Sequence, residues 1–243
     1  MNKDKTELIV VTSKDTICEK LNISLNIGGC NITHNTSATR NLGVLFDTTC
    51  SLKPHVSKIC SSINYHLYSI GKIRKYLDIP TTQKMINATV TSRLDYCNSL
   101  LFGVPVYLVN KLQRCQNNAA RIISLLPKSS HITPIRKELH WLPVQQRIHF
   151  KVLLLTYKCL NGEGPLYLSK LLCPYVPSRQ LRSEDKQLLV VPKYRLSKFG
   201  KRSFSYAAPS LWNTLPLDVK LSPSVDAFKN RLKTHLFRIA YSD

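Results

Sequence analysis

The chain of 243 residues contains 35 Lys and Arg against 14 Asp and Glu, and this formal net charge of +21 at pH 7 indicates a polyanionic partner. Its 43% apolar and 20% charged residues are typical of a packed globular protein and exclude a largely disordered chain. No stretch approaches the roughly 18 to 20 apolar residues of a membrane span, or the about 7 to 15 of a signal-peptide core, so we expect no membrane partner.

The first fifty residues have the pattern of β structure and no net charge, since they hold five basic and five acidic groups. β-Branched and apolar residues at 7–13, period-two alternation at 23–27 and a short apolar run at 41–46 predict two or three short strands. Gly28 and Gly29 would supply the turn of a hairpin. We therefore expect residues 1–50 to form a short antiparallel β region.

Residues 51–127 change to a helical period. Apolar residues three or four positions apart run from Val56 to Leu77, and Pro80 is expected to end this helix. Similar stripes predict a second helix at 81–101 and a third at 108–126. Three consecutive amphipathic helices joined by short loops predict a helical bundle.

Residues 128–243 are mostly helical by pattern, but more interrupted. Apolar spacing predicts one helix over 144–159 and a last helix that Ser224 caps. Between them, prolines and charges mark a loop-rich stretch at about 174–203. Together these elements predict an α+β fold that is mainly α.

The sequence holds few groups for catalysis. It contains no Asp-Asp pair, no phosphate-binding glycine loop and no zinc-ligand spacing among its eight cysteines. Asp4, Asp15 and Asp47 lie in the β region, where a strand end or turn explains each carboxylate better than a metal site does. His140, at a helix entrance, has no nucleophile near it in sequence. We therefore expect no catalytic residue, no metal site and no cofactor, in an intracellular protein, nuclear or cytoplasmic, with reduced thiols.

The basic residues of the middle region carry more information. Residues 51–130 hold eleven Lys and Arg but only two acids. Two rows at helical spacing would face solvent: Lys111, Arg114, Asn118 and Arg121 on the third helix, and Lys58, Tyr65, Lys72 and Tyr76 on the first. Such a row can be an ordinary solvated helix face, but ordinary faces mix charges of both signs. We therefore favour phosphate binding, with tyrosines available for stacking, by Lys58, Lys72, Lys111, Arg114 and Arg121.

Six short segments follow one another as they do in a known family. They are NKDKTE at 2–7, NLGVLFD at 41–47, SRLDYCN at 92–98, AAR at 119–121, LHWLPV at 139–144 and APSLWN at 208–213. In this order they resemble the reverse transcriptase of jockey-like non-LTR retrotransposons (LINE elements). The resemblance covers nearly the whole chain, from the end of the polymerase palm through the primer grip and thumb to the C-terminal region.

The resemblance implies roles for particular residues. Lys5 would lie near the incoming triphosphate, and Leu42, Gly43 and Val44 would form the primer grip. The basic helices would be the thumb, which lies against the template–primer duplex. The aspartates that bind Mg²⁺ in such enzymes belong before residue 1, and the Cys/His knuckle of some relatives is missing.

The expected protein is therefore a truncated fragment of an RNA-directed DNA polymerase, with a palm remnant at 1–50, a thumb at 51–127 and a helical C-terminal region at 128–243. It would bind RNA and DNA without sequence preference, would not polymerise by itself, and could pair with the upstream polymerase half. The alternative is a degenerate or adopted element product that acts as a protein-interaction module. Exposed apolar surface on the strands would favour this alternative.

Overall fold

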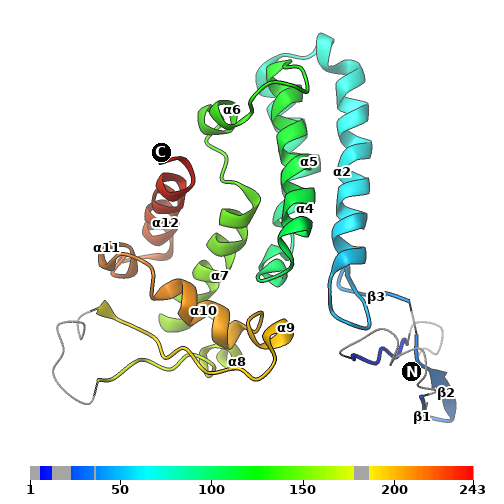
Figure 1. The fold of residues 1–243 in the computed structure, drawn as a ribbon, viewed down its shortest axis with the longest axis vertical. Helices are drawn as coiled ribbons and strands as arrows, with labels where there is room; N and C mark the ends of the chain where they lie inside the picture. Colours follow the sequence, from blue (N-terminus) through cyan, green and yellow to red (C-terminus); the bar gives the residue numbers. More distant parts are fainter. Residues whose placement is uncertain (1–5, 13–22, 36, 178–185, 243) are drawn as a thin grey trace.

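The computed structural model describes residues 6–12, 23–35, 37–177 and 186–242. The fold is mainly helical, with two small antiparallel sheets near the N-terminus (Figure 1). The predicted α+β class, mainly α, is confirmed at this level. Within the described ranges, no helix is both long enough and apolar enough to cross a membrane.

The N-terminal strands form two separate hairpins. Strand β1 (Ser24–Ile27) pairs with β2 (Cys30–Thr33), and strand β3 (Thr39–Asn41) pairs with β4 (Val44–Phe46). Between β1 and β2 the chain turns at Gly28 and Gly29, as predicted, and both have positive φ.

Two strand predictions are wrong in detail. The run 41–46 is not one strand, because Leu42 and Gly43 have φ of 46° and 85° and turn the chain between β3 and β4. The described part of 7–13 forms no strand apart from a single bridge between Leu8 and His34. The N-terminal region therefore forms two separate two-stranded antiparallel sheets within the described residues.

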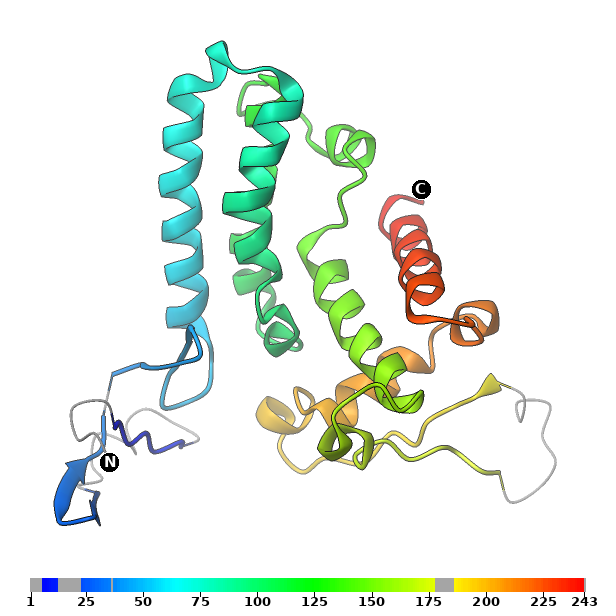
Figure 2. The same ribbon diagram turned by 180° about the vertical axis from the view of Figure 1, so that it is seen from behind.

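A helical bundle follows the hairpins. Helix α2 (Lys53–Ile73) continues into the 3-10 turn η2 (Arg74–Tyr76) and packs along α5 (Val106–Ser124), as Figure 1 shows. In the reverse view of Figure 2, the segment between these two helices lies in front of α5. The chain between α2 and α5 forms α3 (Ile79–Ile86), the π-helical turn η3 (Asn87–Thr91), α4 (Ser92–Asp95) and the 3-10 turn η4 (Asn98–Leu101).

The second helical segment differs from the expected helix at 81–101. It begins earlier, because the Asp78 carboxylate accepts a hydrogen bond from the backbone N–H of Thr81 (2.9 Å) and caps the helix. Pro80 lies in the first turn, where a missing N–H costs nothing, and so it starts this helix instead of only ending the previous one. The segment ends before Cys97, which takes a left-handed conformation with φ of 50°.

The predicted apolar stripes form the core of the bundle. Val56 and Ile63 of α2 and Leu108 and Leu112 of α5 are each at most 1% exposed. Ile73 was expected in the same stripe but is 42% exposed, because α2 ends there. The helical period therefore identified the buried faces except at the helix end.

The C-terminal region packs around a second apolar cluster. Its helices are α6 (Thr133–Glu138), α7 (Val144–Leu160), α8 (Leu166–Ser169), α9 (Ser197–Gly200), α10 (Phe204–Trp212), α11 (Leu217–Lys220) and α12 (Val225–Tyr241). The buried Phe228 ring stacks on Tyr157 with ring centroids 4.2 Å apart, next to the buried Trp212. Ser224 caps α12 as predicted, since its Oγ accepts from the N–H of Ala227 (3.2 Å).

Hydrogen bonds hold the connection between α6 and α7 from two sides. From α5, the buried Gln116 donates to the Leu142 carbonyl (2.9 Å), and Gln113 accepts from the N–H of Val144 (2.9 Å). From the end of α12, the Tyr241 hydroxyl donates to the Trp141 carbonyl (2.5 Å). The bundle and the C-terminal region are therefore joined at this segment.

Candidate nucleic-acid interface

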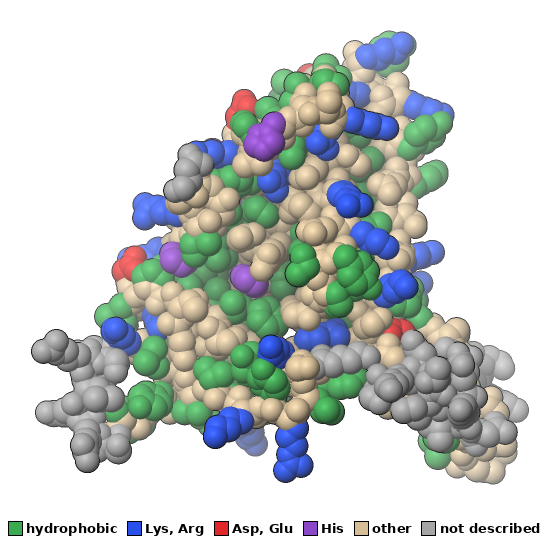
Figure 3. All heavy atoms as spheres, viewed as in Figure 1, with side chains coloured by type: hydrophobic (Ala, Val, Ile, Leu, Met, Phe, Trp, Pro, Cys, Tyr) green, Lys and Arg blue, Asp and Glu red, His purple; other side chains and the backbone are tan. Residues whose placement is uncertain are grey.

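Two neighbouring helices of the bundle carry no acidic residue: neither α2 nor α5 contains Asp or Glu. Lys and Arg side chains gather over them in the space-filling view (Figure 3). We call this surface the α2–α5 face. It comprises Lys58, Tyr65, Tyr68 and Lys72 of α2 and Lys111, Arg114, Asn118 and Arg121 of α5.

Cations alternate with exposed tyrosines along α2. Lys58 and Lys72 are exposed, and Tyr65 is 68% exposed, in agreement with the predicted row. Tyr68 was not among the expected residues, yet it is 65% exposed and the Lys72 ammonium lies 4.4 Å from its ring centroid. Its spacing of three from Tyr65 and four from Lys72 is the signal that would have identified it. Exposed rings beside ammonium groups suit stacking on bases next to phosphates. Tyr76 is also exposed, in η2 beyond the end of α2.

The row on α5 is less uniform than its spacing predicted. Lys111, Arg114 and Asn118 are exposed. Arg121 is half-buried, and its guanidinium donates to the Ser130 carbonyl (3.3 Å) and to Asn118 Oδ1 (3.4 Å). Arg121 therefore helps to fix the turn after α5 and has fewer donors left for a phosphate than a solvent-facing cation would have.

A hollow of about 490 Å³ lies between the C-terminal halves of α2 and α5. Tyr68 and Gly71 line it from α2, Asn118 and Arg121 line it from α5, and Lys128 lines it from the following turn. Tyr68 of α2 and Arg121 of α5 therefore border the same hollow, although Lys58, Tyr65 and Lys72 of the predicted α2 row do not line it.

Arg74 is a buried basic residue of the bundle that also forms part of the wall of this hollow. It is 6% exposed, and its guanidinium donates to the carbonyls of Ile122 (2.9 Å), Ile123 (2.7 Å) and Leu77 (2.6 Å). The carbonyls of Ile122 and Ile123 lie in the last turn of α5, where intrahelical partners are missing and the helix dipole favours a cation. Arg74 therefore joins the end of α2 to the end of α5.

The hairpin tip that resembles a primer grip is fixed to the end of the bundle. Leu42 is 84% exposed and has a φ of 46°, which is a strained conformation for a bulky residue. Its carbonyl accepts from the Tyr96 hydroxyl (2.5 Å), and Gly43 lies against the same ring. Val44 is only 2% exposed and packs in the core of the bundle. A fixed backbone therefore presents the Leu42 side chain to solvent.

Asp47 secures the connection between this hairpin and α2. Its carboxylate accepts hydrogen bonds from the Thr49 hydroxyl (2.7 Å) and from the backbone N–H groups of Ser51 (2.9 Å) and Leu52 (2.8 Å). Partial burial would raise the pKa of Asp47, but these hydrogen bonds outweigh it and lower the pKa below its ordinary value. The carboxylate thus serves the turn, as its position in the sequence indicates.

Replacing Asp47 by Asn should lower the free energy of unfolding by about 1 kcal/mol at pH 7, because a neutral amide binds these donors less strongly than a carboxylate. The lowered pKa means that the carboxylate stabilises the fold above the unfolded pKa of about 3.9 and loses this effect as the pH falls through the folded value. Urea denaturation from pH 7 to pH 3 should therefore show the two proteins converging below about pH 4. A constant difference over this range would contradict the assignment.

The other candidate catalytic group within the described ranges is His140, whose ring centroid lies 5.8 Å from that of Phe237. Asp95, an acidic residue of the bundle, is paired with Arg147 at 2.8 Å. In this part of the chain, no group of three or more His, Cys, Asp or Glu side chains could hold a metal ion. Lys5, Asp4 and Asp15 lie outside the described residues.

Comparisons of the chain with models of known protein families, with curated proteins and with solved structures find no match. The function of the α2–α5 face is therefore inferred from its own residues.

Proposed function

We propose that the chain binds nucleic acid through the α2–α5 face, by contacts to the sugar–phosphate backbone and without sequence preference. The observation that carries this proposal is that two adjacent helices present Lys58, Lys72, Lys111 and Arg114 to solvent, with no Asp or Glu on either helix. Solvated helix faces usually mix both signs, which limits repulsion when no partner is bound. On the α2–α5 face the Lys and Arg side chains repel one another, and a bound polyanion would offset this repulsion by attracting them.

The dimensions of the face suit a duplex. An α-helix rises about 1.5 Å per residue, so the interval from Lys58 to Lys72 covers about 20 Å and that from Lys111 to Arg121 about 15 Å. Base pairs are about 3.4 Å apart, so the face spans about four to six of them. Over that length, its cations would contact about four or five phosphates.

Within this proposal the chain is the thumb-containing part of a reverse transcriptase of the jockey-like retrotransposon type, and its ligand is an RNA–DNA template–primer. The tyrosines of the face would stack on exposed base or sugar surfaces. Leu42 at the hairpin tip would contact the primer end. The Mg²⁺-binding aspartates would come from another segment of the polymerase, so the described residues bind the substrate and do not catalyse.

The salt dependence of binding tests this proposal. The affinity for an RNA–DNA duplex of about 20 base pairs should give a slope of log K against log salt of roughly −4, and should fall about 10²-fold between 50 and 200 mM salt. Duplexes of unrelated sequence should bind equally well, because phosphates carry no sequence information. A slope near zero would contradict the proposal, and so would a strong preference for one sequence.

A protein-interaction module is the second candidate function, and one observation favours it. All four residues of β1 are exposed, including Leu25 at 47% and Ile27 at 43%. A two-stranded hairpin leaves unpaired backbone groups at its edges, onto which a strand of a partner protein could add.

The amide hydrogens of residues 23–33 should exchange faster than those of α2 and α5. An isolated two-stranded hairpin is marginally stable, whereas both helices bury apolar residues in one core. Hydrogen exchange followed by mass spectrometry would measure the difference. Equal protection would show that the hairpin belongs to a complete small domain, and would favour the interaction module.

A further inference from the structure

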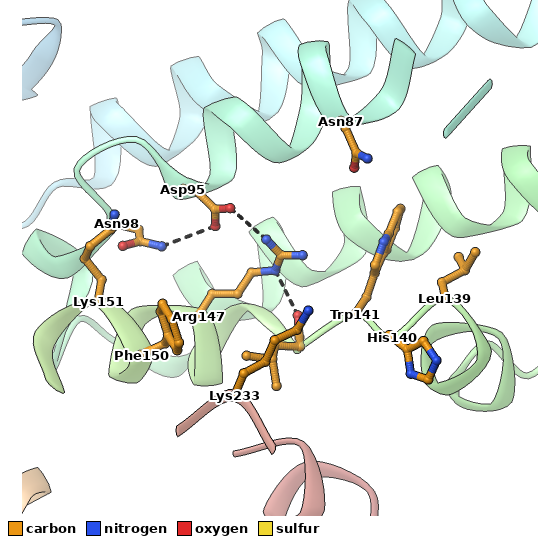
Figure 4. A pocket seen from close by; sticks show the side chains of 11 residues that line it. Asn87, Asp95, Asn98, Leu139, His140, Trp141, Arg147, Phe150, Lys151 and Lys233 are labelled. Carbon is orange, nitrogen blue, oxygen red and sulfur yellow. Dashed lines mark hydrogen bonds and ion pairs between the residues drawn. The ribbon is translucent and has the colours of Figure 1, made fainter. Parts of the chain in front are cut away.

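A pocket of about 410 Å³ lies where the bundle meets the C-terminal region (Figure 4). We call it the junction pocket. Its volume falls within the range of about 300–1,000 Å³ that is typical of small-molecule sites. No residue of α2 or α5 lines it, so it is separate from the α2–α5 face. The side chains on which the inference rests are Asn87, Asp95, Trp141, Arg147, Lys151 and Lys233.

The junction pocket brings together two segments that are far apart in sequence. Asp95 and Asn98 belong to the segment 92–98, and Trp141 belongs to the segment 139–144. Both segments were singled out in the sequence, and neither contributes a side chain to the α2–α5 face. Their convergence on one pocket points to a second site.

One wall of the pocket is a guanidinium plane that is held in position. Arg147 Nη1 lies 2.8 Å from Asp95 Oδ2, and Arg147 Nε donates to the Leu142 carbonyl at 2.9 Å (Figure 4). Asp95 also accepts a hydrogen bond from Asn98 Nδ2 at 3.4 Å. The charges of Asp95 and Arg147 therefore compensate each other, and the ion pair fixes the guanidinium plane in this wall.

Aromatic and basic side chains complete the pocket. The Trp141 backbone is fixed at both ends, because its N–H donates to the Arg136 carbonyl (2.9 Å) and its carbonyl accepts from the Tyr241 hydroxyl (2.5 Å). Its half-buried side chain lines the pocket. Lys151 and Lys233 also line it, and neither forms an ion pair with a described residue. The pocket therefore combines a flat apolar surface with uncompensated positive charge.

We propose that the junction pocket binds one unpaired nucleotide of a nucleic-acid strand, with its base stacked on Trp141 beside Arg147 and its phosphate near Lys151 and Lys233. Unpaired bases are commonly recognised by stacking on aromatic rings and guanidinium planes and by amide side chains at their edges. Asn87, exposed at the rim, offers such an amide. The inference rests on the proposed function, because the duplex bound to the α2–α5 face would bring the unpaired strand to the pocket. The residues that bind the nucleotide are not those of the α2–α5 face.

The test compares two RNA–DNA duplexes of about 12 base pairs, one blunt and one with a single-stranded extension of about four nucleotides that includes 2-aminopurine. The extension should strengthen binding about tenfold, as expected for one stacked base, and binding should quench the 2-aminopurine fluorescence. Trp141→Leu should abolish both effects and leave the affinity for the blunt duplex unchanged.

A second variant avoids the apolar side chains of the pocket. Lys151→Gln/Lys233→Gln should reduce the gain from the extension about fivefold, because the phosphate of the bound nucleotide loses its cations. The matched control is Lys170→Gln/Lys193→Gln, which removes the same charge from exposed residues outside the pocket and should keep the gain. This pair decides the question if the Trp141 variant does not fold.

The outcomes separate the pocket from the α2–α5 face. Equal affinity for the two duplexes, or a gain that survives in the folded pocket variants, would overturn the pocket proposal and leave the duplex site untouched. A gain that is lost only in the pocket variants would support the pocket, even if binding of the blunt duplex proved insensitive to salt and so contradicted the proposed function.

Discussion

Replacing Arg74 by Met should lower the free energy of unfolding by about 3 kcal/mol, because it leaves buried carbonyls without partners. The Arg74 guanidinium is bound to the carbonyls of Ile122, Ile123 and Leu77 at 2.6 to 2.9 Å. Met has a similar length and an apolar stem, so the change removes the donors and the charge but little packing volume. Urea denaturation followed by circular dichroism at pH 7 would measure the loss.

Lys75→Met is the matched control, since Lys75 is the next residue and is exposed. A surface substitution of this kind should change the free energy of unfolding by less than about 0.5 kcal/mol. Arg74→Lys should recover only part of the loss, because one ammonium cannot reproduce the planar fork that reaches three carbonyls. An Arg74→Met variant as stable as the control would mean that water satisfies these carbonyls and that Arg74 does not join the helices.

Arg74 also shows how far helical periodicity can predict this fold. It follows Ile70 by four residues and so continues the buried stripe of α2, yet a basic residue at this position suggests a surface cation. Its burial depends on carbonyls that lie 48 and 49 residues further along the chain. A local pattern can predict which face of a helix is buried, but it does not show which distant groups make a buried charge acceptable.

The difference between local patterns and distant contacts also explains why the predicted ends of helices and strands were less accurate than their buried faces. Helices α2, α5, α7 and α12 were predictable because each buries a stripe whose period is local. The break before Cys97 and the turn at Leu42 depend on residues other than glycine with positive φ. The Tyr96 side chain stabilises the turn at Leu42 by a hydrogen bond over 54 residues, which the sequence does not reveal.

The α2–α5 face and the junction pocket differ in how far each could be predicted from local sequence patterns. The α2–α5 face could be predicted largely from sequence, since the solvent-facing row of a helix follows once its buried row is known. Arg121 departs from the prediction because its partner Ser130 lies beyond the end of α5. The junction pocket could not be predicted, because Asp95, Trp141 and Lys233 come together only through the packing of α4, the α6–α7 connection and α12.

Changing Lys111 and Arg114 together to Gln should flatten the slope of log K against log salt from roughly −4 to roughly −2 for an RNA–DNA duplex. Each neutralised phosphate contributes about −0.9 to this slope, so the loss of two contacts removes about two units. Both side chains are exposed, whereas the buried face of α5 contains Leu108 and Leu112, so the helical circular dichroism should stay the same. Titrations at four or five salt concentrations, with the same duplex for both proteins, would give the two slopes.

The Lys170→Gln/Lys193→Gln protein removes the same net charge from outside the α2–α5 face, and its slope should stay within about half a unit of the original. This control separates phosphate contacts from a general effect of net charge. Arg121→Gln should lower the free energy of unfolding but change the salt slope little, because Arg121 is half-buried and its guanidinium donates to the Ser130 carbonyl. If the slope of a folded Lys111→Gln/Arg114→Gln protein were unchanged, the row on α5 would be an ordinary solvated face, and any phosphate contacts would have to lie elsewhere on this cationic chain.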